Sequence, residues 1–327
     1  MKALVTAEFP TDGLDELRAL GYEPVHAGWG VTRQALDAGE LIAALDGVEV
    51  LICELETVDA VVLAVAPELK LVASCRGNPT NVDLQAAAER GVIVLSTPGR
   101  NAISVADFTM GLLLTHVRRI AASEVQLRER GWMTEGDLPY FHFRGPELDG
   151  RTIGLVGLGA IGRLVADRAR GFGMNVVAFD PFVVSPPDGV ELVTLDELLV
   201  RSDAVSIHCP LTSETRGLIG RRELGLMRAD AVLVNTARAA VVDETALLAT
   251  LRHHDIAGAA LDVFWEEPLA PDHPIRDLDN VTITPHVAGA ADDVQRHHAR
   301  MIIDDIERWQ VGRPLEHAVV QSDGGTS

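Results

Sequence analysis

The stretch Gly157-Leu158-Gly159-Ala160-Ile161-Gly162 decides how this chain folds, because it joins a predicted strand to a predicted helix. The apolar stretch 151–156 comes directly before it, and the amphipathic stretch 163–171 comes directly after it. Strand, glycine-rich turn and helix form the context in which this spacing of glycines indicates a dinucleotide-binding site. The first glycine allows a tight turn, the second lets the backbone approach a pyrophosphate, and the third lets the helix pack against the strand.

An acidic residue follows at the distance that a dinucleotide site requires. A second predicted strand, 175–179, ends in Asp180, and an acid about 20 residues beyond such glycines binds the ribose hydroxyls of NAD. The Asp180 carboxylate would repel the 2′-phosphate of NADP, and no arginine follows it directly, so the sequence favours NAD. The alternative interpretation is an ordinary turn between a strand and a helix, followed by an acid by chance.

Length and composition are those of a globular protein with more than one core. A chain of 327 residues usually forms two domains. The formal net charge of −20 argues against nucleic acid or an anionic membrane as partner, because both need a basic surface. An anionic substrate is compatible with this charge if arginines gather in a cleft.

No targeting segment is expected from the residues at the start of the sequence. The apolar run in 1–8 is shorter than that of a signal peptide and contains an acid, and no run reaches the length of a membrane span. The cysteines Cys53, Cys75 and Cys209 are far apart and odd in number, which favours small buried thiols in a cytoplasmic protein and gives no metal-binding spacing. The residues 321–327 are expected to form a loose polar tail.

Two series of alternating strands and helices divide the chain. In the first series the alternation indicates a parallel, doubly wound sheet. A long helix is then expected at 103–129, and a loop at 131–150. The strands of the first series are expected at 3–7, 48–53, 71–75 and 92–95, and its helices at 14–20, 33–45, 58–65 and 84–90.

The second series begins at Arg151 and has six expected strands, the set of a Rossmann dinucleotide-binding domain. A last helix, 292–309, leaves too little sequence for another domain, so we expect it to return to the first. The prediction is therefore an α/β chain with two doubly wound parallel-sheet domains. The six strands are expected at 153–156, 176–179, 204–208, 231–235, 257–261 and 281–284; the substrate-binding domain comprises 1–100 and 291–327, and the NAD-binding domain comprises 101–290.

Charged side chains follow three strands of the second series. Arg238, Glu267 and His286 each come after a different strand. Ligands of open α/β sheets bind outside the carboxyl ends of the strands, so these side chains are expected to converge on one edge. They supply a base of near-neutral pKa, a carboxylate to hold it and a cation for an anionic substrate, a set suited to hydride transfer with proton exchange.

Several stretches of the second series together are specific to one family. They are 157–162, 208–215, 235–238 with 242–247, 258–264, Glu267-Pro268 and Pro285-His286. With these stretches, in this order and spacing, the sequence resembles the D-isomer-specific 2-hydroxyacid dehydrogenases, which include phosphoglycerate dehydrogenase, D-lactate dehydrogenase, glyoxylate reductase and formate dehydrogenase. The resemblance runs from about residue 40 to 315 and implies a Rossmann NAD-binding domain inserted into a flavodoxin-like substrate domain.

The resemblance implies the catalytic roles. His286 matches the acid/base that exchanges the hydroxyl proton, and Glu267 matches the carboxylate that pairs with it and favours the imidazolium form. Arg238 matches the residue that binds the substrate carboxylate and polarises the carbonyl, for which a guanidinium fork is suited. The alternatives are that His286 is a structural histidine, that Glu267 is a surface acid with Glu266 beside it as a competing candidate, and that Arg238 is a surface arginine.

The resemblance also implies the contacts with NAD and with substrate. In the first domain, the stretch 101–107 resembles the segment where the family's formate dehydrogenases hold substrate and nicotinamide. Expected cofactor contacts are Gly157, Gly159, Ala160, Ile161, Gly162, Asp180, Cys209, Thr215, Thr236, Ala237, Arg238, Asp262, His286 and Gly289. Expected substrate contacts are Gly77, Asn78, Asn101 and Arg238, together with Arg76, which departs from the family pattern.

The histidine pairs His253-His254 and His297-His298 are candidate metal ligands. No third ligand is evident for either pair, so we interpret both as solvated helix faces and predict no metal site.

Two departures from the family pattern stand out. Ala239 and Ala240 replace two glycines after Arg238, which costs little where φ is negative. In the substrate loop, 75–83, Pro79 removes an amide donor and Arg76 adds a cation. We hypothesise that Arg76, with the help of Arg100, binds a second anionic group of the substrate, such as a phosphate or distal carboxylate; the alternative is an arginine paired with a structural acid.

The aromatic group 140–143 falls in the loop that helps to form the dimer in this family. In some relatives an aromatic from this loop enters the partner's active site, which makes Tyr140 and Phe141 candidates; the alternative is an interface anchor away from substrate. The resemblance thus implies a cytoplasmic homodimer.

The function predicted from the sequence is that of an NAD-dependent oxidoreductase that interconverts a D-2-hydroxyacid and its 2-oxoacid. A phosphoglycerate-like or sugar-acid-like substrate is favoured. The alternatives are a glyoxylate or hydroxypyruvate reductase, and a non-catalytic NAD-sensing binding protein.

Overall fold

The computed structural model describes residues 1–133 and 138–320, and the chain divides into two compact units. The first unit comprises Met1–Asn101 and Ala291–Ser327, and the second comprises Ala102–Ala290. The chain therefore leaves the first unit after Asn101 and re-enters it at Ala291. The predicted polar tail at 321–327 lies outside the described residues.

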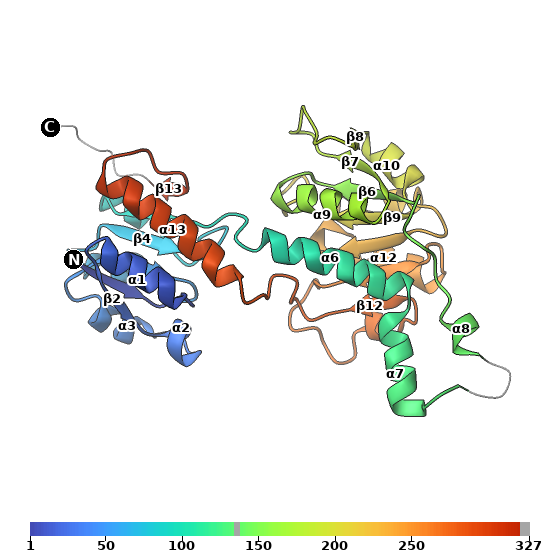
Figure 1. Ribbon diagram of the computed structural model, residues 1–327, viewed down its shortest axis with the longest axis horizontal. Coiled ribbons are helices and arrows are strands. Elements are labelled where there is room, and N and C mark those ends of the chain that lie inside the picture. Colours follow the sequence, from blue (N-terminus) through green and yellow to red (C-terminus); the bar gives the residue numbers. More distant parts are fainter. Residues whose placement is uncertain (134–137, 321–327) are drawn as a thin grey trace. The chain divides into compact units, whose positions relative to one another are not determined.

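The first unit is built on a six-stranded sheet of order β13-β5-β4-β3-β1-β2 (Figure 1). The order 2-1-3-4-5 of its parallel strands is that of flavodoxin-like folds, and β13 adds an antiparallel edge. The strands are β1 (Lys2–Val5), β2 (Glu23–His26), β3 (Val48–Cys53), β4 (Leu71–Ser74), β5 (Ile93–Leu95) and β13 (Ala318–Val320).

Helices cover both faces of this sheet, and each face has its own apolar core. Leu17 and Ile302 pack on one face, and Leu41 and Val62 pack on the other. The first face carries α1 (Thr11–Ala19) beside α13 (Val294–Gln310), and the second carries α3 (Ala38–Ala44), α4 (Ala60–Ala64) and α5 (Leu84–Glu89).

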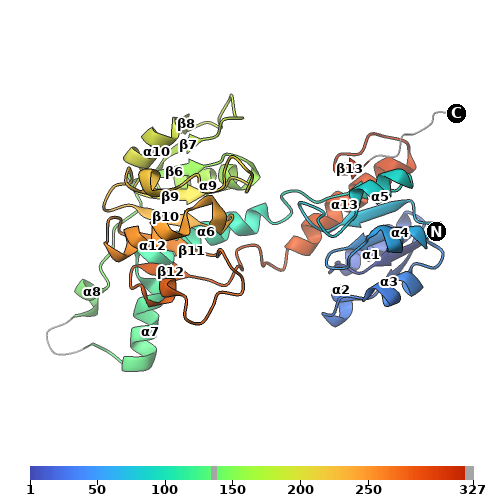
Figure 2. The same ribbon diagram turned by 180° about the vertical axis from the view of Figure 1, so that it is seen from behind.

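The second unit is built on a seven-stranded parallel sheet of order β12-β11-β10-β9-β6-β7-β8 (Figure 2). Numbered within the unit, its order is 3-2-1-4-5-6 with one strand more, the order of the Rossmann fold. Its strands are β6 (Thr152–Val156), β7 (Asn175–Phe179), β8 (Val190–Leu192), β9 (Ala204–Ile207), β10 (Val232–Asn235), β11 (Gly258–Leu261) and β12 (Val281–Ile283).

Helices again cover both faces of the seven-stranded sheet. Leu113 and Val165 contribute to the core of one face, and Leu198, Leu224 and Leu247 to the core of the other. The first face carries α6 (Ala102–Val117) and α9 (Ala160–Gly171), and the second carries α10 (Leu195–Arg201), α11 (Arg221–Leu224) and α12 (Glu244–Arg252); two 3-10 helices, η1 (Ala239–Val241) and η2 (Pro274–Asp277), lie in the connections.

Both sheets of the prediction are confirmed, and several elements differ. The strands β2, β8 and β13 were not expected, because β2 and β8 lack a clear apolar run and β13 has only three residues. The helix predicted at 33–45 is present as α3, but it begins only at Ala38, and a separate short helix, α2 (Trp29–Thr32), precedes it. The predicted loop 131–150 contains α8 (Pro139–His142).

The long helix predicted at 103–129 is wrong, because it breaks where Arg119 adopts a left-handed backbone with φ of 53°. The chain continues as α7 (Ile120–Arg130), none of whose residues is buried, and α7 projects away from its sheet in Figures 1 and 2. Within the described part of the chain, no helix combines the length and apolar character needed to cross a membrane.

Candidate active site

The glycine-rich loop lies where β6 ends, against the end of β9. Gly157 has φ of 101°, and a Cβ atom there would lie 2.7 Å from the backbone nitrogen of Cys209. Gly162 is equally restricted, because a Cβ atom there would overlap the carbonyl oxygen of Gly157. Both glycines are therefore required for the loop to sit close to the sheet and for α9 to pack against it.

The middle glycine faces open space instead. No atom lies within 4 Å of a Cβ atom built on Gly159, which is the N-cap of α9 and supplies no capping side chain. The amides at the start of this 12-residue helix thus have room for an anionic group in front of them. This geometry fits the pyrophosphate of a dinucleotide.

Asp180 lies just after β7 and holds its carboxylate against the same loop. Its Oδ2 accepts a hydrogen bond of 2.8 Å from the Leu158 amide, and its Oδ1 accepts one of 3.0 Å from the Phe182 amide. The carboxylate is thereby fixed beside the glycine-rich loop, as the ribose of NAD requires. Residues of this chain thus fit NAD at both its pyrophosphate and its ribose.

The other predicted cofactor contacts follow the neighbouring strands. Cys209, after β9, is half-buried, and burial raises the pKa of its thiol to about 11, so the thiol stays protonated. Thr215 donates a hydrogen bond of 2.6 Å to the Pro210 carbonyl. Thr236, after β10, is buried and hydrogen-bonded to Thr109 of α6 at 2.9 Å. All three lie at the carboxyl edge of the sheet.

Asp262, which follows β11, is buried and holds the turn that carries His286. Its Oδ1 accepts hydrogen bonds from the Thr284 hydroxyl at 2.6 Å and the Val287 amide at 3.0 Å, and its Oδ2 accepts one from the Ala288 amide at 2.8 Å. His286 between them has φ of 54°, a left-handed conformation that a non-glycine residue adopts only when its surroundings impose it. This supporting role of Asp262 and Thr284 was not predicted.

Glu267 and His286 form a close pair. Glu267 Oε2 lies 2.7 Å from His286 Nδ1, and its Oε1 accepts a hydrogen bond of 3.0 Å from the Phe264 amide. Burial raises the pKa of Glu267, but the hydrogen bonds from His286 and Phe264, with the nearby charge of Arg238, outweigh burial and lower it overall. Because an ionised carboxylate only accepts, His286 Nδ1 carries the hydrogen and Nε2 is left for proton exchange.

A cavity of about 540 Å³ opens beside this pair. Most of its other lining side chains are apolar, so the pair faces a site that suits an organic ligand. Its lining residues are Phe264, Glu267, Pro268, Leu269, Arg276, Ile283, Thr284, Pro285 and His286.

Arg238 follows β10 on a turn that Asn235 holds. Asn235 Nδ2 donates to the Arg238 carbonyl at 3.0 Å, and its Oδ1 accepts from the Ala237 amide at 3.0 Å. The guanidinium is exposed and bonds only the Ala237 carbonyl, at 2.6 Å, among the residues that the structure describes. Ala239 and Ala240 lie in or beside η1 without positive φ, so the expectation that alanine fits there is confirmed.

The predicted site residues are divided between the two units. Arg238, Glu267 and His286 come together in the second unit. Arg76, Gly77, Asn78 and Asn101 belong to the first unit, where the first three follow β4 and Asn101 is its last residue before α6.

The two arginines of the first unit have different surroundings. Arg76 donates from Nε to the Glu54 carbonyl at 2.8 Å and from Nη1 to Thr80 Oγ1 at 3.1 Å, and no carboxylate of residues 1–133 or 138–320 lies within ion-pair distance of it. Arg100 instead forms an ion pair of 2.7 Å with Glu54. The arginine paired with an acid is therefore Arg100, whereas contact of Arg76 or Arg100 with substrate stays a prediction.

The histidine pairs differ from the prediction. His253 and His254 are exposed, as expected, but His298 is buried and contacts Arg100 and Glu8. The periodicity of α13 could have shown this, because His298 lies four residues from Val294 and from Ile302, on the face that packs on the sheet. Outside 134–137 and 321–327, no group of three or more His, Cys, Asp or Glu side chains is arranged to hold a metal ion.

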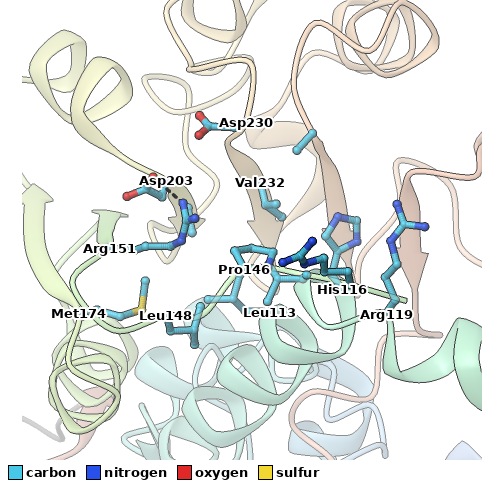
Figure 3. Close-up of a pocket in the computed structure, with 15 residues that line it drawn as sticks. Leu113, His116, Arg119, Pro146, Leu148, Arg151, Met174, Asp203, Asp230 and Val232 are labelled. Carbon is cyan, nitrogen blue, oxygen red and sulfur yellow. Dashed lines mark hydrogen bonds and ion pairs between the residues drawn. The ribbon is translucent and has the colours of Figure 1, made fainter. Parts of the chain in front are cut away.

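A second cavity, of about 350 Å³, lies at the amino ends of the strands of the second unit (Figure 3). Asp203 is paired there with Arg151 at 3.0 Å. Burial, with a smaller effect of the charge of Arg119, lowers the pKa of His116 to about 4, which leaves this histidine neutral. This cavity is at the edge opposite to His286 and holds none of the predicted site residues.

Comparison with known proteins agrees with this geometry. Residues 110–288 match the model of the D-isomer specific 2-hydroxyacid dehydrogenase NAD-binding domain. The chain is 38% identical to YoaD of Bacillus subtilis, named as a 2-hydroxyacid dehydrogenase, over 96% of this chain and 92% of YoaD. It is 39% identical to a glyoxylate reductase of Thermofilum pendens over 92% of this chain and 88% of that one.

A D-3-phosphoglycerate dehydrogenase of Archaeoglobus fulgidus is 37% identical over 98% of this chain, which spans only 59% of that longer protein. The structure of TT0316 from Thermus thermophilus superposes with a TM-score of 0.81 at 39% identity, covering 98% of this chain and 100% of that one. An NAD-dependent formate dehydrogenase of Staphylococcus aureus in complex with NAD superposes with a TM-score of 0.77 at 29% identity, covering 99% of both chains. The chain thus belongs to the D-isomer specific 2-hydroxyacid dehydrogenase family and is an NAD-dependent oxidoreductase of that family.

Proposed function

We propose that this protein interconverts a D-2-hydroxyacid and its 2-oxoacid, with a phosphoglycerate-like or sugar-acid-like substrate. The observation that carries the proposal is the Glu267–His286 pair, 2.7 Å apart, with the Arg238 guanidinium near enough to lower the pKa of Glu267. In this proposal the first unit binds the substrate and the second binds NAD.

His286 acts as the acid and base of the reaction. When a 2-oxoacid is reduced, His286 Nε2 gives its proton to the carbonyl oxygen, and in the opposite direction it takes the hydroxyl proton. Glu267 keeps the imidazole oriented and balances the positive charge of its protonated form. NAD bound at the glycine-rich loop supplies the chemistry of hydride acceptance and donation.

Arg238 orients the substrate by binding its carboxylate, because its fork of donors matches two carboxylate oxygens. Its guanidinium bonds only its own neighbour's carbonyl among the described residues, so it is available for this role. Cofactor contacts are assigned to the same residues as in the sequence prediction, with Asp262 acting also through the His286 turn.

For the substrate we assign contacts to Arg76, Gly77, Asn78 and Asn101. The Arg76 guanidinium has donors to spare, since only two of its nitrogens are bonded within the described part of the chain. It is therefore suited to a phosphate or distal carboxylate. If Arg76→Ala leaves kcat/KM unchanged for every active substrate, this assignment is wrong and the smaller glyoxylate or hydroxypyruvate become the favoured substrates.

We further propose a homodimer that acts in the cytoplasm. The support for a dimer is α7, which has no buried residue, and the exposed Trp132, Tyr140 and Phe141, which follow it in the sequence, because exposed apolar and aromatic side chains that gather in one segment favour an interface. The support for the cytoplasm is that Cys53, Cys75 and Cys209 are all free thiols. Sedimentation of the purified protein tests the dimer.

A panel of 2-oxoacids with NADH and with NADPH, followed by nicotinamide absorbance, tests the proposed reaction. We expect turnover with NADH and a loss of about 10²- to 10⁴-fold in kcat for His286→Ala. His253→Ala, at an exposed histidine of the same unit, is the matched control and should keep full activity. NADH binding without turnover of any acid would favour an NAD-sensing binding protein instead.

A further inference from the structure

Two histidines near the start of α13 hold Arg100, which lies in the segment where the chain leaves the first unit. His297 Nδ1 lies 3.0 Å from the Arg100 carbonyl oxygen, and His298 Nδ1 lies 3.1 Å from Nη1 of the Arg100 guanidinium. A carbonyl only accepts and a guanidinium only donates, so His297 Nδ1 is a donor and His298 Nδ1 is an acceptor. The backbone and the side chain of Arg100 are therefore both held from α13.

The second ring nitrogen of His298 is used as well. With Nδ1 accepting, Nε2 carries the hydrogen and donates to the Glu8 carbonyl at 2.7 Å. The ring is 1% exposed and stacks on Phe9, with centroids 6.0 Å apart. His298 thus sits in one tautomer and one orientation, with every ring nitrogen bonded.

The second terminal nitrogen of the Arg100 guanidinium bonds a residue that directly follows β3. Arg100 Nη2 donates to Glu54 Oε1 at 2.7 Å, and both side chains of this ion pair are only 20% and 14% exposed. The backbone carbonyl of Glu54 in turn accepts from Arg76 Nε at 2.8 Å. Glu54 therefore joins the Arg100 segment to the loop 75–83.

This network lies where the chain enters and leaves the first unit. Arg100 is followed by Asn101, the last residue of that unit, and α13 begins three residues after re-entry at Ala291. Both connecting segments are thereby tied to the ends of β1, β3 and β4. A charged arginine that is largely withdrawn from water is costly unless its donors are matched, as they are here by Glu54 and His298.

We infer that Arg100, His298 and Glu54 form a clamp that positions Asn101 and the loop 75–83 to bind the 2-hydroxyacid substrate. The inference rests on the proposed function, because that is where Asn101 and Arg76 receive their roles. The clamp residues are positioning residues: they act through Asn101 and Arg76, and their own polar groups are already bonded to one another.

Variants of His298 test whether its hydrogen bonds, and not only its burial, hold the clamp together. His298→Gln keeps a donor toward the Glu8 carbonyl and loses the acceptor for Arg100, whereas His298→Asn keeps an acceptor near the position of Nδ1. Glu54→Gln keeps the size of the side chain and removes the ion pair. Arg90→Met, at an exposed arginine of the same unit, is the control.

We expect His298→Gln and Glu54→Gln to raise KM for the 2-oxoacid about tenfold, with a smaller change in kcat, because misplaced binding groups weaken substrate orientation. His298→Asn should restore part of the loss. The dissociation constant of NADH, from fluorescence titration, should stay within about twofold of the parent for each variant, since the dinucleotide residues lie in the other unit. Unchanged KM, or a loss of NADH binding equal to the loss of substrate binding, overturns the inference.

Amide hydrogen exchange of the protein without ligands gives a readout that needs no substrate. Clamp variants should exchange faster at 75–83, 97–103 and 291–300 than the parent and Arg90→Met, because the network ties these segments together. If exchange there equals that of the control, the clamp is refuted even when the enzyme is active. If exchange rises but no 2-oxoacid is reduced by the parent, the clamp stands and the proposed function fails.

Discussion

At the scale of the residue, the position of His286 depends on neighbouring side chains that hold its backbone turn and its ring. His286 occupies a left-handed conformation that Asp262 stabilises by accepting three hydrogen bonds around it. Glu267 then fixes the tautomer of the ring. The pattern Pro285-His286 predicted the acid/base, but only the structure shows that a hydroxyl two residues earlier, on Thr284, helps to aim it.

Thr284→Val should therefore lower kcat severalfold while NADH binding persists. The change removes one of the three hydrogen bonds to a buried carboxylate, which costs about 1–3 kcal/mol of stability and loosens the His286 turn. Steady-state kinetics and thermal unfolding measure both effects. Thr245→Val, at an exposed threonine of α12, is the control, and equal kinetics for the two variants would remove Thr284 from the support of His286.

At the scale of the element, the glycine-rich loop was predictable because each glycine has a separate physical reason. Gly157 adopts a positive φ, and Gly162 lets the helix approach the Gly157 carbonyl closely. Gly159 leaves open space at the start of α9. The break between α6 and α7 was not predictable, since Arg119 is neither glycine nor proline and the helical pattern continues through it. Short strands such as β2 and β13 depend on their neighbours in the sheet, and their own four and three residues give little signal.

Alanine at two of these glycines should weaken NADH binding in both cases but lower stability in only one. Gly157→Ala forces a methyl group against the backbone of Cys209 at positive φ, so we expect a loss of about 1–3 kcal/mol in stability and of NADH binding with it. Gly159→Ala has open space and φ of −74°, so the melting temperature should hold, while its methyl group weakens NADH binding by intruding on the pyrophosphate position. Thermal unfolding and fluorescence titration distinguish them; a destabilised Gly159→Ala would contradict the loop geometry.

At the scale of the whole molecule, both sheets were predictable from alternating strands and helices, and so was the return of the last helix. The residues predicted to be catalytic in the second unit follow the ends of its strands, where parallel topology gathers side chains that are distant in sequence. The clamp could not be foreseen, because Arg100 and His298 are 198 residues apart and no local pattern relates them. His298, predicted to lie on a solvated helix face, is buried.

Buried histidines in both units make the stability of the molecule sensitive to acid. Burial is the largest cause that lowers the pKa of His298 and of His116 to about 4, and burial lowers that of His208 to about 3. Around His298, the Arg100 and His297 charges lower its pKa further, while Glu8 raises it. In the unfolded chain these groups titrate near 6.5, so the unfolded state binds more protons between that pH and about 4.

Stability is therefore fully present above about pH 6.5 and falls as the pH drops toward 4, by about 3 kcal/mol for His298 alone. Urea unfolding at pH 7, 6, 5 and 4 measures this slope. His298→Gln should reduce the slope, because glutamine has no proton to gain, whereas the exposed His253→Gln should leave it as in the parent. An unfolding free energy that stays constant from pH 7 to 4 would show that these rings are open to water and that the clamp is not closed in solution.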